Sequence, residues 1–271
     1  MAKSKGLTAK TADRHFLYQA AVQDSESETE RIIEIFKKIR RRSPMTLRED
    51  FCGTAIACAS WVKSHRKRTA MGLDLDEDVL AWGRQHNLRP LGDDAKRVTL
   101  LTKNVISTTS PKVDLCTAFN FSYCIFKDRK DLIRYFKRVR SSLVDDGVFM
   151  MDLYGGTDAG EVLEEARKCK WKGKTFTYVW DQAYFNPIDN HVINHIHFRF
   201  PDKSEMKKAF TYDWRLWSPV EVSECLAEAG FTRSRVWWEE EDEDGDGTGV
   251  YHPVTEAENQ AGWICYIVAE R

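Results

Sequence analysis

An alternating pattern of strand and helix signals between residues 46 and 153 most restricts the fold of this 271-residue chain. The pattern predicts strands over 46–50, 69–75, 98–104, 113–119 and 148–153, of which 113–119 is strongly apolar, and helices over 54–64, 77–87 and 128–143. Strand–helix–strand units form parallel sheets, because the helix carries the chain back across a face of the sheet. The sequence therefore predicts an open α/β sheet with helices on both faces.

The flanking segments extend this pattern, and one segment breaks it. Ser25 with Glu28 and Ser218 with Glu221 are capping boxes that predict helix starts, and strands over 231–238 and 263–269 close the chain. The break lies between residues 175 and 214, where aromatic and β-branched segments run over 175–185, 191–200 and 205–214. This pattern predicts an antiparallel meander inserted into the α/β chain, and residues 1–12 are expected to form a loose tail.

Composition restricts the class of protein. Apolar residues make up 42% of the chain, enough to bury a large core, and the formal net charge is −1. Such a balance gives no overall field that favours nucleic acid or an anionic membrane. No apolar stretch approaches the roughly 20 residues that span a bilayer, and the N-terminus lacks the apolar core of a secretory signal. The seven cysteines include no Cys-x-x-Cys pair, which disfavours a disulfide framework or zinc knuckle and indicates the cytoplasm.

Ligands of open parallel sheets bind beyond the carboxyl ends of the strands. Gly53 follows the first strand, where a missing side chain lets a ligand approach the backbone. Asp74 ends the second strand about 20 residues later, the separation at which an acidic side chain binds ribose hydroxyls. The next two strands end at Asn104-Val105 and Asn120-Phe121. We therefore expect these four places to share one nucleoside site.

These strand ends resemble the motifs of class I S-adenosylmethionine-dependent methyltransferases. Residues 47–55 are similar to the first motif, with Glu49 in the acidic place and Gly53 as the middle glycine, although Phe51 and Ala55 stand where further glycines are usual. The run 72–74 resembles the ribose-binding segment of that family. The resemblance covers about residues 25–269.

The resemblance implies a Rossmann-like, doubly wound, mainly parallel seven-stranded sheet with an antiparallel β insertion. It implies S-adenosylmethionine as cofactor, S-adenosylhomocysteine as product, and in-line transfer of a methyl group to nitrogen or oxygen of a small molecule. The cofactor-binding residues expected on this basis are Tyr18, Glu49, Gly53, Thr54, Asp74, Leu75, Asn104, Val105, Asn120 and Phe121. The candidates for a catalytic base are Tyr123, His195 and Tyr154.

The resemblance also organises the chain. Residues 1–24 are expected to form an N-terminal arm, 25–174 and 215–271 the methyltransferase core, and 175–214 an insertion that covers the active site. We expect no membrane partner and no nucleic-acid partner, and a homodimer is the oligomer that we would expect. His191, His195 and His197 share one strand face, but no fourth ligand accompanies them, so we expect no metal site.

Other interpretations stay open at this point. Asp74 is also suited to cap the following helix, Asn104 to cap a turn, and Thr54 to serve as an N-cap. Tyr18 and Tyr123 are also suited to simple aromatic packing. At the level of function, the alternatives are a protein or RNA methyltransferase, a nucleoside-binding module without catalysis, and an NAD-dependent oxidoreductase.

Overall fold

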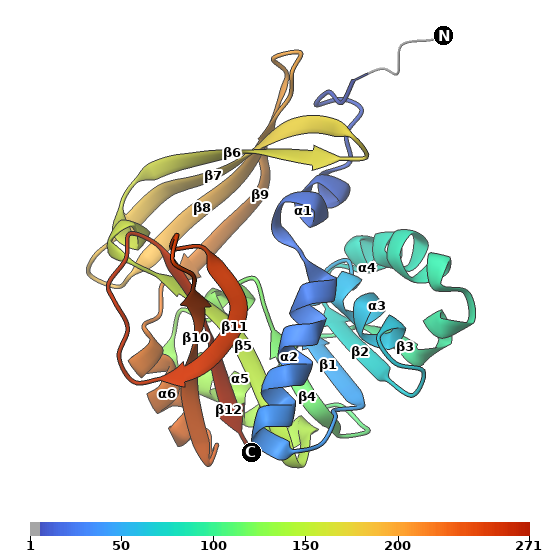
Figure 1. Cartoon of the computed structure of the whole chain (residues 1–271), viewed down its shortest axis with the longest axis vertical. Coiled ribbons are helices and arrows are strands. Elements are labelled where there is room, and N and C mark those ends of the chain that lie inside the picture. The colour runs from blue at the N-terminus through green and yellow to red at the C-terminus, as the bar shows by residue number, and fades with distance from the viewer. Residues whose placement is uncertain (1–5) are drawn as a thin grey trace. The chain divides into compact units, whose positions relative to one another are not determined.

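The computed structural model describes residues 6–271, so the first five residues of the expected arm lie outside the described residues. The described chain divides into two compact units. One unit comprises Ser25–Thr157 and Trp217–Arg271, and the other comprises residues 6–24 and Asp158–Leu216 (Figure 1). The first is termed the core unit and the second the meander unit.

The core unit contains one eight-stranded sheet in the order β11-β10-β12-β5-β4-β1-β2-β3. Its strands are β1 (Thr46–Asp50), β2 (Thr69–Asp74), β3 (Val98–Thr102), β4 (Val113–Ala118), β5 (Leu143–Gly155), β10 (Arg233–Glu241), β11 (Gly247–Val254) and β12 (Trp263–Glu270). Strands β3, β2, β1, β4 and β5 pair in parallel, and β12, β10 and β11 add antiparallel pairs. The expected mainly parallel α/β sheet is therefore confirmed.

The sheet has eight strands, so the expected number of seven is wrong. The additional strand is β11, which pairs with β10 and lies between the two expected closing strands, 231–238 and 263–269, where the sequence predicts no strand. Of its side chains only Tyr251 is buried. A strand with so little apolar alternation carries almost no period-two signal.

Helices cover both faces of this sheet. They are α2 (Ser25–Arg40), α3 (Ile56–Lys63), α4 (Glu77–Gly83), α5 (Arg129–Ser142) and α6 (Pro219–Glu228). Successive side chains of a strand point to opposite faces. Glu49 contacts α3, through the Cys58 N–H, whereas its neighbour Asp50 accepts a hydrogen bond from Tyr135 of α5. Hence α3 and α5 lie on opposite faces of β1.

The segment between β2 and β3 is longer than the expected helix 77–87. After α4 the chain continues as a π-helix, Arg84–Leu88, and a 3-10 helix, Arg89–Arg97.

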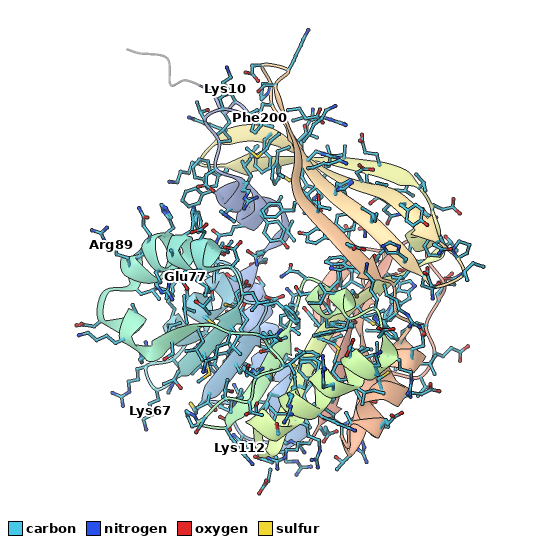
Figure 2. All side chains as sticks on the ribbon, turned by 180° about the vertical axis from the view of Figure 1, so that it is seen from behind. Lys10, Lys67, Glu77, Arg89, Lys112 and Phe200 are labelled. Carbon is cyan, nitrogen blue, oxygen red and sulfur yellow. The ribbon has the colours of Figure 1, made fainter. Side chains whose placement is uncertain are left out.

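The carboxyl and amino ends of the parallel strands lie at opposite ends of the sheet. Figure 2 labels Glu77, which follows the carboxyl end of β2, and Lys112, which precedes the amino end of β4, towards these opposite ends. The carboxyl ends therefore share one edge, as a parallel sheet requires.

The meander unit contains a four-stranded antiparallel sheet in the order β6-β7-β8-β9. Its strands are β6 (Leu163–Trp171), β7 (Lys174–Asn186), β8 (His191–Arg199) and β9 (Glu205–Arg215). Three of them match the expected meander, and β6 extends it towards the N-terminus beyond the expected limit at residue 175. Most side chains of β6 are exposed and many are charged, which is typical of an edge strand and hides it from a search for apolar segments.

The N-terminal segment is part of the meander unit's packing. Leu7 and Leu17, the latter on α1 (Arg14–Val22), are buried in a cluster with Phe176 and Phe198. The expectation of a loose tail is therefore wrong for the described residues 6–12. The reason is tertiary, because an aromatic sheet face provides an apolar surface that a short segment can cover.

No helix within residues 6–271 has the length and apolar character needed to cross a membrane.

The close approach of α4 to the loop after β1 yields a test. An added Cβ at Gly83 would lie 2.4 Å from the Thr54 carbonyl oxygen. Gly83→Ala should therefore lower the free energy of unfolding by about 1–3 kcal/mol, although alanine is the better helix former. At Gly262 an added Cβ would meet no atom of the described chain within 4 Å. Urea unfolding should show no comparable loss for Gly262→Ala; equal loss in both variants contradicts the explanation.

Candidate active site at the carboxyl ends of the parallel strands

The loop between β1 and α3 turns through left-handed backbone conformations. Phe51, Gly53 and Ala55 have φ values of 57°, 50° and 55°. Phe51 and Ala55 are the two departures from the family's glycine pattern, yet both adopt the conformation that glycine favours. A bulky residue such as Phe51 is strained there. The Cys52 N–H donates to the Leu73 carbonyl oxygen (3.0 Å), which keeps the loop attached to β2.

Gly53 and Asp74 lie together, as expected. The Gly53 N–H donates to Asp74 Oδ2 (2.8 Å), and the Asp76 N–H donates to Asp74 Oδ1 (3.0 Å). A carboxylate offers about four acceptor sites, so these two bonds leave capacity for two hydroxyls. Among the described residues, an added Cβ at Gly53 would meet only Val79, at 3.9 Å, within 4 Å. The backbone at Gly53 is therefore open to close approach.

Glu49 is buried beneath this loop, with 9% of its surface exposed. Its Oε2 accepts the Cys58 N–H of α3 (3.1 Å). The N-cap of α3 is Ala55, which has no side-chain acceptor, so Glu49 rather than Thr54 takes that function. Burial raises the pKa of Glu49 to about 7, and the neighbouring charges of Asp74 and Asp50 add to the shift.

Thr54 is not the N-cap of α3. It is buried, and its carbonyl oxygen accepts a hydrogen bond from Asn87 Nδ2 (2.8 Å). Leu75, by contrast, is 66% exposed directly after Asp74. An exposed leucine beside a carboxylate at the strand end provides an apolar surface for a ligand.

The segment after β3 lies beside Asp74. The Lys103 N–H donates to the Asp74 carbonyl oxygen (3.0 Å). Asn104 is exposed, and its Oδ1 accepts the Ile106 N–H (2.9 Å). The Asn104 side chain therefore caps a turn, which was the alternative interpretation of this residue. The following residue, Val105, is buried.

The loop after β4 is held by a residue that sequence reasoning missed. Asn120 and Phe121 have φ values of 56° and 57°, and their N–H groups donate to the two carboxylate oxygens of Asp152 on β5 (2.8 and 2.9 Å). Burial raises the pKa of Asp152 to about 7, and both hydrogen bonds oppose that shift. Asp152 is the only charged residue in the otherwise apolar segment 148–153, and this was the sequence signal that could have indicated its role.

Two of the candidate bases follow in the same unit. Tyr123 is fully buried, and no group within residues 6–271 forms a hydrogen bond with its hydroxyl. Burial raises the pKa of Tyr123 well above its usual value, so the phenol stays protonated near neutral pH. Tyr154 is half-buried and packs on Phe121, with ring centroids 4.6 Å apart.

The remaining candidates, Tyr18 and His195, belong to the meander unit. Tyr18 packs on Phe210, with ring centroids 4.9 Å apart. The Nδ1 atom of His195 lies 3.0 Å from the Thr211 hydroxyl, and burial, reinforced by Lys208, lowers the pKa of His195. The nearby His197 contacts Asp181, with 3.0 Å between Nε2 and Oδ2. The roles of Tyr18 and His195 stay predictions.

The chemistry of the core-unit residues fits a nucleoside that carries positive charge. Asp74 can accept ribose hydroxyls, and Gly53 leaves its backbone accessible. Glu49 and Asp74 place negative charge at one edge of the sheet, which favours a cation. No group of three or more potential metal ligands occurs among the residues that the structure describes.

Comparisons with known proteins agree with this architecture. The chain matches no protein-family model and no curated protein sequence. Among solved structures, an S-adenosylmethionine-dependent methyltransferase from Clostridium acetobutylicum superposes with a TM-score of 0.68 at 15% identity, over 94% of this chain and 96% of that chain. Streptomyces venezuelae DesVI gives 0.68 at 17% identity, over 94% and 95%.

A third structure is that of CalS10 from Micromonospora echinaspora, described as an amino pentose methyltransferase with bound S-adenosylmethionine. It superposes with a TM-score of 0.67 at 13% identity, over the full length of both chains. The chain therefore has the Rossmann-like fold of these S-adenosylmethionine-dependent methyltransferases.

Proposed function

We propose that this chain is an S-adenosylmethionine-dependent methyltransferase. The hydrogen bond from the Gly53 N–H to Asp74, at the carboxyl ends of two adjacent parallel strands, carries the proposal. It joins an accessible backbone to a carboxylate with remaining acceptor capacity, which is the arrangement that a nucleoside cofactor needs. The fold shared with solved methyltransferases supports the same function.

Each core-unit residue then has a distinct part in binding. Asp74 accepts the ribose hydroxyls, and Leu75 with Asn104 and Val105 flanks the adenine. Gly53 and the following Thr54 admit the methionine part. Glu49 stabilises the positive charge. Bound S-adenosylmethionine supplies a methyl group on a sulfonium, and the chain's own task is to align the acceptor with that methyl group.

We propose nitrogen or oxygen of a small molecule as the acceptor. The names of CalS10 and of the sugar N-methyltransferase KedS8 support a small-molecule acceptor. Asn120 and Phe121 line the proposed transfer site, where Asp152 holds their backbone. Of the candidate bases, Tyr123 stays protonated, because burial raises the pKa of its phenol well above the usual value. Tyr154 and His195 therefore stay the candidates for a base.

We also propose the cytoplasm as the location, because the seven cysteines are free thiols. A homodimer and a covering role for residues 175–214 stay predictions.

Native mass spectrometry of the purified chain tests the proposal. Co-purified or added S-adenosylmethionine should form a one-to-one complex, and a screen of metabolite extracts with labelled methyl donor should then identify the acceptor. Binding of NADH in preference to S-adenosylmethionine would instead support an oxidoreductase. Binding without transfer to any small molecule, protein or RNA would support a non-catalytic module.

Replacement of Asp74 tests the ribose assignment. Asp74→Ala removes charge-assisted hydrogen bonds worth about 1.5–3 kcal/mol each, so calorimetry should show S-adenosylmethionine affinity at least about tenfold weaker. Asp93→Ala, at an exposed aspartate that pairs with Lys96, is the control. Unchanged affinity in Asp74→Ala would refute the ribose assignment.

Glu49 predicts a pH dependence of cofactor binding. Its pKa is about 7, so it is mostly protonated below that pH and mostly ionised above it. Because the ionised form favours a cation, affinity for S-adenosylmethionine should rise about tenfold from pH 6 to pH 8 and level off above pH 8. In Glu49→Gln, this rise in affinity between pH 6 and pH 8 should be absent.

Asp152 also has a pKa of about 7 and therefore supplies the control. If Asp152→Asn retains the pH dependence and Glu49→Gln loses it, Glu49 is the group that responds. The reverse result would place the titration at Asp152 and contradict the role given to Glu49.

A further inference from the structure

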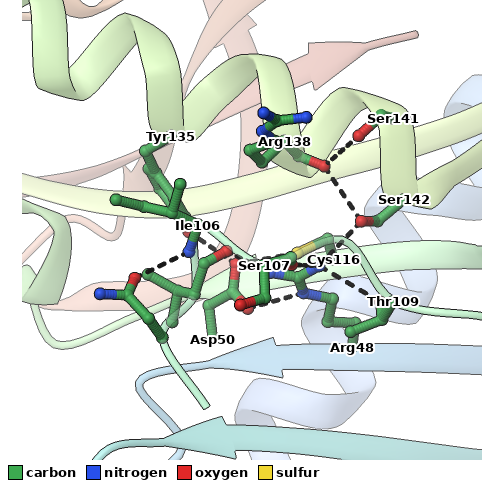
Figure 3. A network of polar contacts seen from close by, with 12 residues as sticks. Arg48, Asp50, Ile106, Ser107, Thr109, Cys116, Tyr135, Arg138, Ser141 and Ser142 are labelled. Carbon is green, nitrogen blue, oxygen red and sulfur yellow. Dashed lines mark hydrogen bonds and ion pairs between the residues drawn. The ribbon is translucent and has the colours of Figure 1, made fainter.

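A fully buried ion pair lies on β1. The side chains of Arg48 and Asp50 are both 0% exposed, and the Nε–Oδ1 distance is 2.7 Å (Figure 3). Burying two charges costs desolvation, and such a pair is often no more stabilising than two apolar side chains of similar volume. Stability of β1 therefore gives no sufficient reason for an arginine at position 48.

Arg48 directs its other donors to the connection between β3 and β4. Nη2 donates to the Val105 carbonyl oxygen (2.6 Å), and Nη1 donates to the Ser107 carbonyl oxygen (3.1 Å) and to the Thr109 hydroxyl (3.2 Å). Nη1 also donates to Ser142 Oγ at the end of α5 (2.8 Å). One side chain thus holds three points of the same connection (Figure 3).

This connection has no helix of its own. In the sheet order, β2 and β1 separate β3 from β4, so residues 103–112 must cross β1 as irregular chain. A local turn joins Asn104 to Ile106 and Ser107. The Val105 and Ser107 carbonyl oxygens are not acceptors in that turn, and such groups need donors when water is excluded. Arg48 donates to both.

Asp50 and its neighbours fix the direction of the guanidinium. Asp50 Oδ2 accepts hydrogen bonds from the Tyr135 hydroxyl (2.9 Å) and from Cys116 Sγ (3.6 Å). Burial raises the pKa of Asp50, and the charge of Arg48 opposes that shift. A planar guanidinium held at Nε presents its other N–H groups in a rigid fork. Its carbonyl contacts at the loop are therefore set in place by β1, β4 and α5.

We propose that the Arg48–Asp50 pair is a positioning device: Arg48 fixes Asn104 and Val105 beside Asp74 and thereby sets the affinity for the adenosine end of the cofactor. The inference rests on the proposed function. The Lys103–Asp74 backbone bond places this segment next to the ribose-binding carboxylate, so displacement of the loop would change the space in which the adenine lies.

The test separates position from stability. The double variant Arg48→Met/Asp50→Leu replaces the pair with apolar side chains, which should largely preserve the fold. We expect S-adenosylhomocysteine affinity to fall about tenfold, the factor that corresponds to one lost hydrogen bond. Hydrogen exchange should accelerate in residues 103–109 and remain slow in β1. Both readouts are measured on the full chain, by calorimetry and mass spectrometry.

Arg68→Lys is the matched control, since Arg68 is also buried but precedes the opposite, amino end of β2. It should leave S-adenosylhomocysteine affinity within about twofold. A folded double variant with wild-type affinity overturns the inference and leaves the proposed function intact, whereas a wild-type chain that binds no S-adenosylhomocysteine removes both. If the double variant does not fold, Arg48→Lys, which keeps the charge but loses the fork, is judged by the same two readouts.

Discussion

Carboxylates that accept backbone N–H groups hold together the edge of the sheet on which the proposed site depends. Asp74 binds the Gly53 amide, Glu49 binds the Cys58 amide of α3, and Asp152 binds two consecutive amides after β4. Loops and helix starts leave such amides without backbone partners. Carboxylates accept hydrogen bonds from these amides at the edge where the proposed nucleoside site lies. The same contacts therefore fix the loop conformations and place negative charge at the proposed site.

The first strand shows how closely structure and function share residues. Its three consecutive charged residues, Arg48, Glu49 and Asp50, are all buried. Because successive side chains of a strand point to opposite faces of the sheet, they contact different elements. Glu49 faces α3 and the proposed cofactor, whereas Arg48 and Asp50 face α5 and the β3–β4 connection. Burial of charge is costly unless partners compensate it. Here Arg48 and Asp50 compensate each other, and Cys116 of β4 also donates to Asp50. The other partners lie on α3, on α5 and in the β3–β4 connection.

Within the core unit, four of the five non-glycine residues with positive φ angles lie in the same region. Phe51, Ala55, Asn120 and Phe121 hold positive φ angles without being glycine, at a cost of about 1–3 kcal/mol each. Asp152 offsets part of this cost through its two hydrogen bonds. Tertiary contacts thus hold the loop after β1 in left-handed conformations at Phe51 and Ala55, although neither residue is glycine.

Local signals in the sequence determined the parallel core. The alternation of strand and helix signals predicted β1 to β5 and their helices, although Leu47 is the only apolar residue of β1. The spacing of Gly53 and Asp74 predicted their meeting, because parallel strands bring their carboxyl ends to one edge. The acceptor could not be predicted, since no local motif encodes it.

Tertiary structure alone decided the remainder. β6 and β11 bury few side chains, Leu7 is buried only because an aromatic sheet lies beside it, and the arginine at position 48 reads in the sequence as an ordinary surface charge. Asp152 meets Asn120 and Phe121 across 32 and 31 residues of chain. Contacts of this kind depend on which strands become neighbours, and a linear pattern carries no information about a partner that only folding brings near.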